Sequence, residues 1–566
     1  MIRFPLTVII GLLLSITASA VTITVDPVNG NDANNGVSAA VETLGRAWEL
    51  IPVGGGNTMI LKPGTYDDPN DEVTTPDIVP GEIGAYNIIK AETDGTAIIM
   101  QPMNLTPDTP APDGWPQTSD NQSYVPHHLQ FEGLKWFNEI DNTPGAGGGS
   151  GVNVSIVGHD IKILRSSFRG AGNCNNYSTL AIGRGDTEAQ NWKPTHHVLL
   201  EDSWVYGIGG RYNISTFNAE DIIYRRVVAR HDGGWNSAVE VTGCKSDPEA
   251  AIAVYNSSRV LLQNVIGIDN DGDYSNNEGN WEGNFYTIYN SESGNDNPFN
   301  PTNHATRGVV HDNEDNKISG SMLIYGHGNG YKYEVGNASQ VIDGPSFVRS
   351  IYGAILEDSV AVGMINHGIT ISSGGGSQEE IEVDVFDTLI STVSTVSADQ
   401  MNVAVRDNDG AGANLFNLNR VLLYGYESTA IIDSGGSTAI GEVDVYCYGP
   451  GSDNCDSALG YDPVPLDYSF PMLLNAGRTL NAGPTIIYRI GVSGTLYGEA
   501  GYDTVTTQPL WPFPYENRIK SDFSEITPLR GWASGSKTLT QYVWEALLGD
   551  STTKSPNDGV SVSQTP

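Results

Sequence analysis

Eight short segments of this chain resemble one another, and their repetition constrains the fold more than any other feature. Most copies place an apolar pair before a polar pair, followed by a small or β-branched residue and another apolar residue. No copy is long enough to bury its own apolar face, so a continuous core requires the copies to stack. The copies are Ile163–Phe168, Leu199–Trp204, Ile223–Val228, Leu261–Ile266, Lys317–Met322, Ile355–Val360, Val385–Ile390 and Asn419–Tyr424.

The spacing of the copies indicates a coil of parallel strands. The fifth residues of the first five copies are separated by 36, 24, 38 and 56 positions; they are Ser167, Ser203, Val227, Val265 and Ser321. The shortest interval is close to one turn of a parallel β-helix, roughly 20–30 residues. The longer intervals indicate either loops inserted between strands or a degenerate turn in between. We therefore predict a parallel β-helix with at least eight turns between residues 50 and 480.

The N-terminus has the features of a secretory signal. Arg3 precedes an apolar run from Phe4 to Ile16, and Ala18-Ser19-Ala20 fits the small-residue cleavage rule. We expect residues 1–20 to be removed and the mature protein to be secreted or held at the cell surface. The apolar run is short for a bilayer span and no later stretch is longer, so we expect no membrane insertion.

After the signal the sequence divides into three regions. The first is an N-terminal cap that contains one short helix between two strands. The second is the coil with its loop insertions. The third is a C-terminal cap region with a final helix and a disordered tail, in which Thr538 begins the helix and Gly549 ends it. The regions are residues 21–68, 69–500 and 501–566, and the cap elements are Val21–Val25, Glu42–Leu50 and Thr58–Leu61.

Charge and cysteine content restrict the partners of the chain. Its net charge of −38 argues against nucleic acid, because nothing in it would neutralise a phosphate backbone. Four cysteines in an exported chain predict two disulfides. Cys447 and Cys455 flank one loop and are expected to pair, which leaves Cys174 to pair with Cys244.

The segment from Asp26 to Tyr66 also resembles a known group of proteins. The segment Asp26-Pro-Val-Asn-Gly-Asn-Asp32, the short helix, and then Leu61-Lys-Pro-Gly-Thr-Tyr66 are similar to the first turn of secreted proteins of the pectate-lyase-like superfamily. This resemblance implies an all-β fold, the right-handed parallel β-helix. It leaves the chemistry open, because one fold hosts many functions.

Two segments that directly follow repeat strands carry candidate chemistry. They are Arg230–Asn236 and Gly328–Lys332, and between them Asp269, Asp271 and Asp273 place three carboxylates within five residues. Because successive strands of a coil stack, we expect residues that follow them to share one face. A lysine beside carboxylates and a bound cation suits β-elimination from a uronic acid. The cation acidifies the proton at C5, and the amine removes it.

The same segments resemble the calcium-dependent β-helix pectate lyases of the ninth polysaccharide lyase family. Gly-Asn-Gly-Tyr-Lys is similar to the family's Gly-Asn-Gly-Phe-Lys, which implies that Lys332 is the catalytic base. Asp232 and Trp235 match its calcium segment, where Gly233 and Asn236 replace two carboxylates. We expect Ca²⁺ to bind Asp232 and the three later aspartates. The expected substrate-binding residues are Arg230, His231, Trp235, Trp281 and Tyr331.

Two functions from different classes fit these observations. The first is action on an extracellular polysaccharide, with calcium-assisted β-elimination of a uronate polymer as the reaction. The second is a non-catalytic surface or matrix protein, an adhesin or filament subunit that binds polysaccharide or itself. The acidic charge favours the second, because an acidic enzyme repels a polyuronate unless cations bridge the two.

Overall fold

A computed structural model describes about half of the chain, including most of the strands and parts of the C-terminal region. The described residues are 20–74, 78–105, 126–137, 154–171, 178–183, 195–208, 212–231, 250–270, 285–289, 313–326, 329–335, 349–364, 367–373, 379–391, 403–407, 415–424, 429–433, 439–448, 490–504, 513–526, 538–539 and 542–543.

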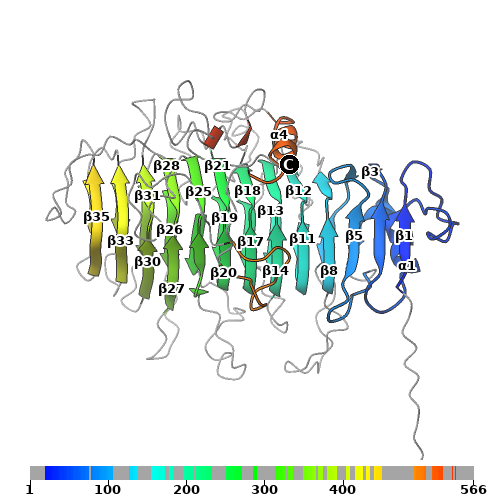
Figure 1. The fold of residues 1–566 in the computed structure, drawn as a ribbon, viewed down its shortest axis with the longest axis horizontal. Coiled ribbons are helices and arrows are strands. Elements are labelled where there is room, and N and C mark those ends of the chain that lie inside the picture. The colour runs from blue at the N-terminus through cyan, green and yellow to red at the C-terminus, as the bar shows by residue number, and fades with distance from the viewer. Residues whose placement is uncertain are drawn as a thin grey trace, which may run out of the picture.

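The described strands form a coil built from three rows of parallel strands (Figure 1). Two rows belong to one 24-stranded sheet. Row 1 consists of β1 (Thr22–Val25), β2 (Thr58–Leu61), β5 (Asn87–Ala91), β8 (His127–Glu132), β11 (His159–Leu164), β14 (Thr195–Glu201), β17 (Ala219–Arg225), β20 (Ser258–Gln263), β23 (Asn313–Glu314), β24 (Lys317–Ser319), β27 (Arg349–Glu357), β30 (Glu379–Phe386), β33 (Leu415–Tyr424) and β35 (Ala439–Tyr448). Row 2 consists of β3 (Gly64–Tyr66), β6 (Ala97–Ile99), β9 (Lys135–Phe137), β12 (Ser167–Ala171), β15 (Trp204–Ile208), β18 (Val228–His231), β21 (Ile266–Asn270), β25 (Met322–Gly326), β28 (Val360–Met364) and β31 (Leu389–Ser391).

Row 3 is a separate sheet of 11 strands that closes the coil. The chain passes from row 3 to row 1, then to row 2, and returns to row 3. Row 3 consists of β4 (Val73–Thr74), β7 (Met103–Leu105), β10 (Val154–Ile156), β13 (Ser178–Gly183), β16 (Tyr212–Phe217), β19 (Ala250–Tyr255), β22 (Phe285–Tyr289), β26 (Asn329–Val335), β29 (His367–Ser373), β32 (Val403–Asp407) and β34 (Thr429–Asp433). The predicted right-handed parallel β-helix is therefore confirmed, and its hand is the usual one for parallel crossovers.

The repeated segments form the corner between row 1 and row 2. At this corner one residue adopts positive φ, such as Arg165 at 51° and Asp202 at 52°, and a buried residue follows it. The hydroxyl of Ser203 accepts a 3.1 Å hydrogen bond from the backbone N–H of Ser166 in the preceding turn and donates one of 2.8 Å to the carbonyl of Glu201. The buried hydroxyl of Ser203 thus has both a donor and an acceptor.

The strand register corrects the alignment of Ser167 with Ser203. It also shows how many turns the longest interval spans. Ser167 pairs with Trp204, so the residue that stands opposite Ser203 is Ser166. The interval of 56 positions ending at Ser321 spans a single turn, because β21 pairs directly with β25. The long intervals of the sequence are therefore loops inserted within one turn, and no degenerate turn separates these strands.

The core runs along the inside of the coil. In row 1, Ile161, Val198, Ile222 and Val260 stand in successive strands and are each at most 1 % exposed. Parallel strands lie about 4.8 Å apart, so each of these side chains packs on its neighbours above and below. Truncating one of them to alanine removes packing worth about 2–5 kcal/mol.

A short helix covers the N-terminal part of the coil. Helix α1 spans Leu44–Leu50, and the side chain of Thr43 caps it by accepting a 3.2 Å hydrogen bond from the N–H of Arg46. Its buried side chains include Trp48. A 3₁₀ turn, η1 (Pro69–Asp71), packs beside it, and Asp71 accepts a 2.8 Å hydrogen bond from the N–H of Leu44. The helix begins at Leu44, where the sequence led us to expect Glu42.

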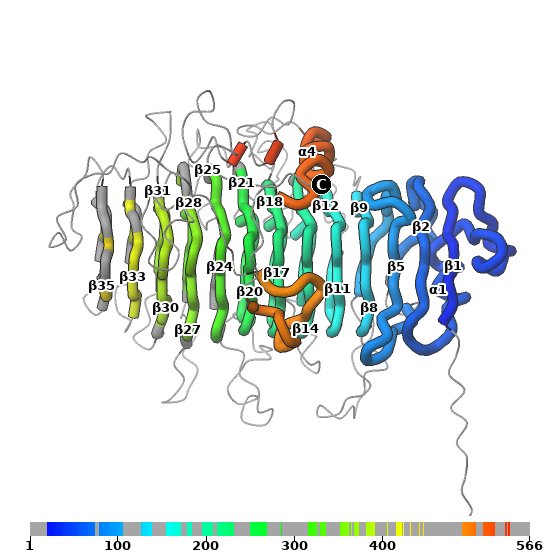
Figure 2. Tube along the Cα trace, in the orientation of Figure 1, coloured from blue at the N-terminus to red at the C-terminus, as the bar shows by residue number. Residues whose placement is uncertain are grey.

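The C-terminal region returns to the middle of the coil and lies on its outside (Figure 2). Residues 490–504 lie across row 1, and helix α4 (Glu516–Phe523) contacts β15 in row 2. The sequence did not predict α4. In the segment where a last helix was expected, the described residues include one helical hydrogen bond of 3.0 Å, from the N–H of Tyr542 to the carbonyl of Thr538.

Two further expectations meet different outcomes. Among the described residues, no helix is long and apolar enough to cross a membrane. The side chains of Cys174, Cys244, Cys447 and Cys455 lie outside the described residues, so both disulfides remain predictions.

Candidate functional site

The outer face of row 3 carries the lysine that the sequence singled out. Along β26 the side chains alternate between the core and the outside, as they do in any strand. Tyr331 and Tyr333 point inward and are at most 2 % exposed. Lys332 and Glu334 point outward, with 12 % and 22 % of their side chains exposed. Lys332 is therefore a partly sheltered cation on the surface of the coil.

Polar groups of the neighbouring strand lie beside Lys332. Its register partner on β29 is Thr370, whose hydroxyl donates a 2.9 Å hydrogen bond to the amide oxygen of Asn329. The ring Nδ1 of His367 lies 2.7 Å from the same oxygen. Asn329, Thr370 and His367 are each at most 5 % exposed. The lysine thus stands next to a buried and connected polar network.

Lys332 is paired with a carboxylate of its own strand. Its Nζ lies 2.5 Å from the carboxylate of Glu334. An opposite charge this close favours the ammonium form of the amine. In the arrangement observed, Lys332 is suited to bind an anionic group, and a role as a proton acceptor requires that Glu334 be drawn away.

Aromatic rings gather on the same face, two to three strands before β26. Tyr212 and Tyr255 are joined by a hydrogen bond between their hydroxyls, and the ring of Phe217 stacks on that of Tyr255 at 4.7 Å. Tyr212 is 2 % and Tyr255 8 % exposed. These tyrosines form a packed satellite cluster of the structure, and their rings are not free to stack on a sugar.

Tyr331 belongs to the core, which corrects its expected role in substrate binding. It is fully buried, its ring meets that of Phe285 edge-on at 5.9 Å, and its hydroxyl donates a 3.1 Å hydrogen bond to the carbonyl of Val360. Side chains alternate along β26, so Tyr331 points inward where its neighbour Lys332 points outward. Its ring therefore cannot contact a polymer on the surface.

Arg230 is also placed differently from the expectation. Its guanidinium is buried and donates hydrogen bonds of 2.9 Å and 3.4 Å to the carbonyls of Phe523 and Ile526. The guanidinium also lies over the ring of Phe523 at 4.4 Å. A cation that binds the last carbonyls of a helix satisfies them and complements the helix dipole. Arg230 therefore holds the end of α4 against row 2.

The remaining predicted residues are described in part or not at all. Trp235, Trp281, Asp232, Asp271 and Asp273 lie outside the described residues. Of Asp269 and His231 only the backbone is described, at the ends of β21 and β18. These strands are neighbours, since β18 pairs with β21 and β21 with β25. The chain segments that follow them therefore all start at the same corner, which leads to row 3.

The C-terminal region covers the outside of the other two rows. Asp522 of α4 accepts hydrogen bonds from Lys135 and Trp204 of row 2, at 2.8 Å and 2.7 Å. On row 1, Arg225 donates 3.0 Å hydrogen bonds to the carbonyls of Val492 and Tyr502. These contacts of residues 490–526 are thus made with rows 1 and 2, and Arg518 contacts Asp94 and Arg165 at the corner between them; the candidate site lies on row 3.

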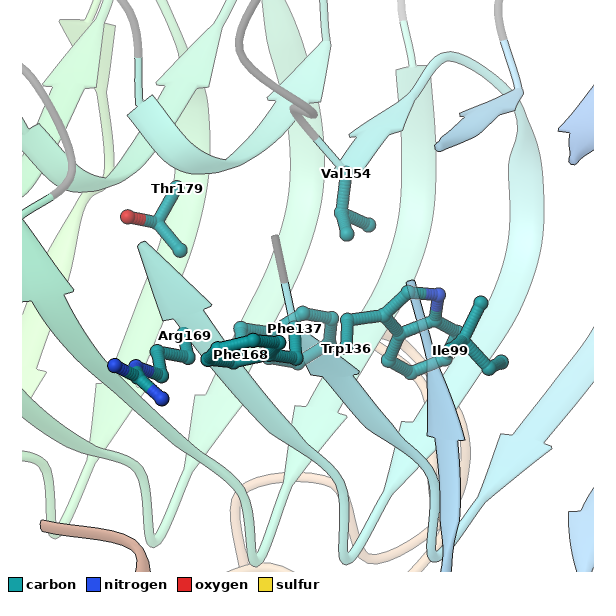
Figure 3. Close-up of a pocket in the computed structure, with 7 residues that line it drawn as sticks. All are labelled: Ile99, Trp136, Phe137, Val154, Phe168, Arg169 and Thr179. Carbon is teal, nitrogen blue, oxygen red and sulfur yellow. The ribbon is translucent and has the colours of Figure 1, made fainter. Parts of the chain in front are cut away.

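A small cavity lies between row 2 and row 3 (Figure 3). Its volume is about 10 Å³, which holds one water molecule at most. Trp136 and Phe168, whose rings stack at 5.0 Å, form one side of it. Within the described part of the chain, the indole N–H of Trp136 and the hydroxyl of Thr179 have no hydrogen-bond partner. The cavity is too small for a sugar ring and is not a substrate site.

Some solved structures are similar to this chain, at low sequence identity. No family model matches the chain, and no curated protein matches it. A solved structure of pectate lyase Pel9A is 14 % identical, with 70 % of this chain and 80 % of that one covered and a TM-score of 0.35. The GH136 lacto-N-biosidase from Eubacterium ramulus is 10 % identical, with 69 % and 67 % covered and a TM-score of 0.38. The mannuronan C-5 epimerase AlgE6 A-module from Azotobacter vinelandii is 11 % identical, with 69 % and 91 % covered and a TM-score of 0.34.

These similarities are weak, so the fold assignment rests on the strand pairings of the chain itself. Each described pairing between consecutive turns is parallel and in continuous register, apart from one irregularity between β27 and β30.

Proposed function

We propose that this protein is exported and acts on an extracellular acidic polysaccharide at the outer face of row 3. The reaction that we assign is β-elimination of a uronate polymer, with Lys332 as the base. The observation that carries this proposal is the position of Lys332. It is an outward-facing, mostly sheltered amine at the end of Gly328-Asn-Gly-Tyr-Lys332, beside a polar network that includes Thr370.

The proposed chemistry needs one base and one proton donor. The neutral amine of Lys332 takes the proton from C5 of the uronate, and the electron pair of that C–H bond forms the double bond between C4 and C5. The bond between C4 and the glycosidic oxygen breaks, and the leaving oxygen takes a proton from water. General base catalysis of this kind contributes about 10²–10⁴-fold in rate.

Calcium is the cofactor that we propose for this reaction. Bound Ca²⁺ would neutralise the uronate carboxylate and so make the C5 proton more acidic. The residues that we assign to it are Asp232, Asp269, Asp271 and Asp273. Hard carboxylate oxygens are the ligands that calcium prefers. A cation near Lys332 would also compete for the carboxylate of Glu334 and leave the amine free to accept a proton.

The ion pair between Lys332 and Glu334 favours a second candidate function. With Glu334 at 2.5 Å, Lys332 stays an ammonium group, which binds a polymer carboxylate without abstracting a proton. The protein would then be a non-catalytic surface or matrix protein that binds polysaccharide or itself.

The experiment that separates the two functions uses the mature chain with pectate, alginate and other uronate polymers. The lyase proposal expects an unsaturated product that absorbs in the ultraviolet, formed with calcium and not with chelator. The binding function expects no such product from any uronate, together with retention of the protein on an immobilised polymer. Absence of product, of retention and of self-association would overturn both candidates.

A further inference from the structure

An array of ionisable side chains lies on the outside of row 1, away from the proposed substrate face. Three successive strands each carry two adjacent ionisable residues at or near their start. The pairs are His127–His128 on β8, His159–Asp160 on β11 and His196–His197 on β14. Register aligns the first member of each pair, because His159 stands opposite both His127 and His196.

An unusual backbone conformation places both members of a pair close together. Adjacent residues of a regular strand point to opposite faces of the sheet. Here the second residue of each pair adopts positive φ, with 52° at His128, 53° at Asp160 and 51° at His197. This conformation interrupts the alternation, so both side chains of a pair lie within contact distance. In all three pairs, polar atoms of the two side chains are within 2.9 Å.

The first members of the pairs form a stack along the coil. The rings of His127 and His159 are parallel within 9° with centroids 5.1 Å apart, and those of His159 and His196 within 6° at 4.8 Å. The stack fixes the imidazole of His159 between two flat neighbours. The stack fixes the plane of the ring, and the contact with Asp160 places its Nδ1 beside the carboxylate.

Three donor atoms converge between the first two strands of the array. The Nδ1 of His159 lies 2.7 Å from Oδ2 of Asp160, and the Nε2 of His128 lies 4.0 Å from the same oxygen. One ligand atom from each of these three residues fits within 4.8 Å of the other two. The histidine side chains are at most 9 % exposed, and that of Asp160 is 26 % exposed. The cluster is therefore sheltered yet reachable from solvent.

A fourth residue orients one of the donors. The Nδ1 atoms of His127 and His128 lie 2.9 Å apart, so one of them carries a proton and the other accepts it. In the tautomer in which His127 accepts the Nδ1–H of His128, the Nε2 lone pair of His128 faces Asp160. Support of a ligand histidine by a second hydrogen bond is typical of metal sites.

We propose that His128, His159 and Asp160 form a binding site for one divalent transition metal ion, for which Zn²⁺ is the probe. Two imidazoles and one carboxylate suit zinc and similar ions, whereas calcium prefers oxygen ligands alone. Zinc binds imidazole nitrogen at about 2.0–2.1 Å, so the ion requires His128 to move toward Asp160. The three protein ligands leave one position for water or another ligand. The strong negative charge of the chain also attracts cations to its surface.

The next pair along the array offers a matched control. His197 has the same backbone conformation, and its Nε2 lies 4.0 Å from Asp221. Asp221 is already held by Arg259, which donates hydrogen bonds of 2.6 Å and 3.0 Å to its two oxygens. A carboxylate with both oxygens bound to a guanidinium is a poor metal ligand, so we assign no site to His197.

The test is calorimetric titration of Zn²⁺ into the full mature chain, made without a polyhistidine tag, freed of metal by chelator and kept in excess calcium. We expect one zinc ion per chain, and at least about tenfold weaker binding in His159→Gln and in Asp160→Asn. His197→Asn should bind as the unchanged protein does. Asparagine tolerates positive φ, so Asp160→Asn and His197→Asn are matched in their effect on the backbone.

Three outcomes would overturn the proposal. The first is no zinc binding in the presence of calcium. The second is stoichiometric binding that both His159→Gln and Asp160→Asn retain. The third is a loss in His197→Asn equal to the loss in Asp160→Asn, which would assign the binding to the array as a whole. Circular dichroism of each metal-free variant checks folding, and Asp160→Asn, at the exposed edge of the cluster, provides the test if His159→Gln does not fold.

Discussion

The indole Nε1 of Trp204 donates a 2.7 Å hydrogen bond to Asp522, which lies 318 positions later in the sequence. The other oxygen of this carboxylate accepts a 2.8 Å hydrogen bond from Lys135. Both donors belong to row 2, in the middle of the coil, whereas Asp522 belongs to α4. The C-terminal region is therefore bound to the flank of the coil, where it covers buried polar groups.

Removing this carboxylate should loosen the attachment of α4. We expect Asp522→Ala to lower the free energy of unfolding by about 2–3 kcal/mol, because the buried indole N–H loses its acceptor while Lys135 keeps Glu525. The measurement is urea unfolding followed by tryptophan fluorescence. Asn517→Ala, at an exposed position of the same helix, is the control and should have little effect. Equal stability of the two variants would contradict this account of the attachment.

The attachment of residues 490–504 should depend on pH through Glu201. Its carboxylate lies 2.8 Å from Arg225 and 2.7 Å from Arg226, and accepts a 2.9 Å hydrogen bond from the N–H of Gly494. Burial opposes these interactions, but the pKa of Glu201 is still lowered from its ordinary value of 4.5. A carboxyl group with a lowered pKa stabilises the fold above pH 4.5, and this contribution is lost as the pH falls through the folded-state pKa.

Glu201→Gln tests this dependence. At pH 7 the change should cost about 3–5 kcal/mol, because it removes the carboxylate partner of the buried Arg225, whereas Arg226 keeps Asp202. At an acidic pH, where Glu201 is protonated in both states, the difference between the variant and the unchanged protein should shrink toward zero. Urea unfolding at both pH values measures it. A difference that stays constant with pH would rule out the ionic contribution.

Lys332 should be essential if the protein is a lyase. We expect Lys332→Ala to lower kcat/KM for a uronate polymer by about 10²–10⁴-fold. Lys332→Arg should fail equally, since arginine stays protonated and cannot accept the C5 proton. Glu334→Gln should raise the rate at neutral pH, because it removes the carboxylate that holds Lys332 as ammonium. If both lysine variants still form product, the protein is a lyase and Lys332 is not its catalytic base.

Calcium should stabilise the folded protein through the carboxylates of the loop after β21. A ligand that binds only the folded state stabilises it by about 2.7 kcal/mol at 100 times its Kd. We expect a higher Tm in millimolar calcium than in chelator, and a smaller increase in the double variant Asp271→Asn and Asp273→Asn. Identical midpoints with and without calcium would remove this site from the proposed mechanism.

The exported protein should contain two disulfides, Cys447–Cys455 and Cys174–Cys244, because its four cysteines are expected to meet an oxidising environment. Mass spectrometry of the unreduced, alkylated protein should find no free thiol. Peptide mapping then identifies the two pairs. Four alkylated cysteines would contradict the prediction, and a different pairing would revise it.

Much of the fold follows from local sequence patterns. The repeated segments predict the coil because each encodes its own corner, with a residue that accepts positive φ followed by a small buried residue such as Ser203 or Ser359. The strand Thr58–Leu61 and the short helix before it are also legible, since apolar alternation and a threonine cap act within a few residues. Helix α4 cannot be predicted from local sequence patterns in this way. Its buried apolar residues are Ile519 and Phe523, too few for a periodic pattern, and it depends on its contacts with row 2.

The sequence by itself determined that this chain is a stack of parallel strands, with a lysine shortly after one of the repeated segments. Only the tertiary structure decided which side of each strand faces out, because that depends on where each turn of the coil bends. In β26, Tyr331 faces the core and Lys332 faces the surface. Positive φ at His128 and Asp160 brings together donor atoms that regular strands would separate. The carboxylate of Asp522 binds Trp204 and Lys135 and so attaches α4 to row 2. These partners are hundreds of residues apart in the sequence and meet only in the folded coil.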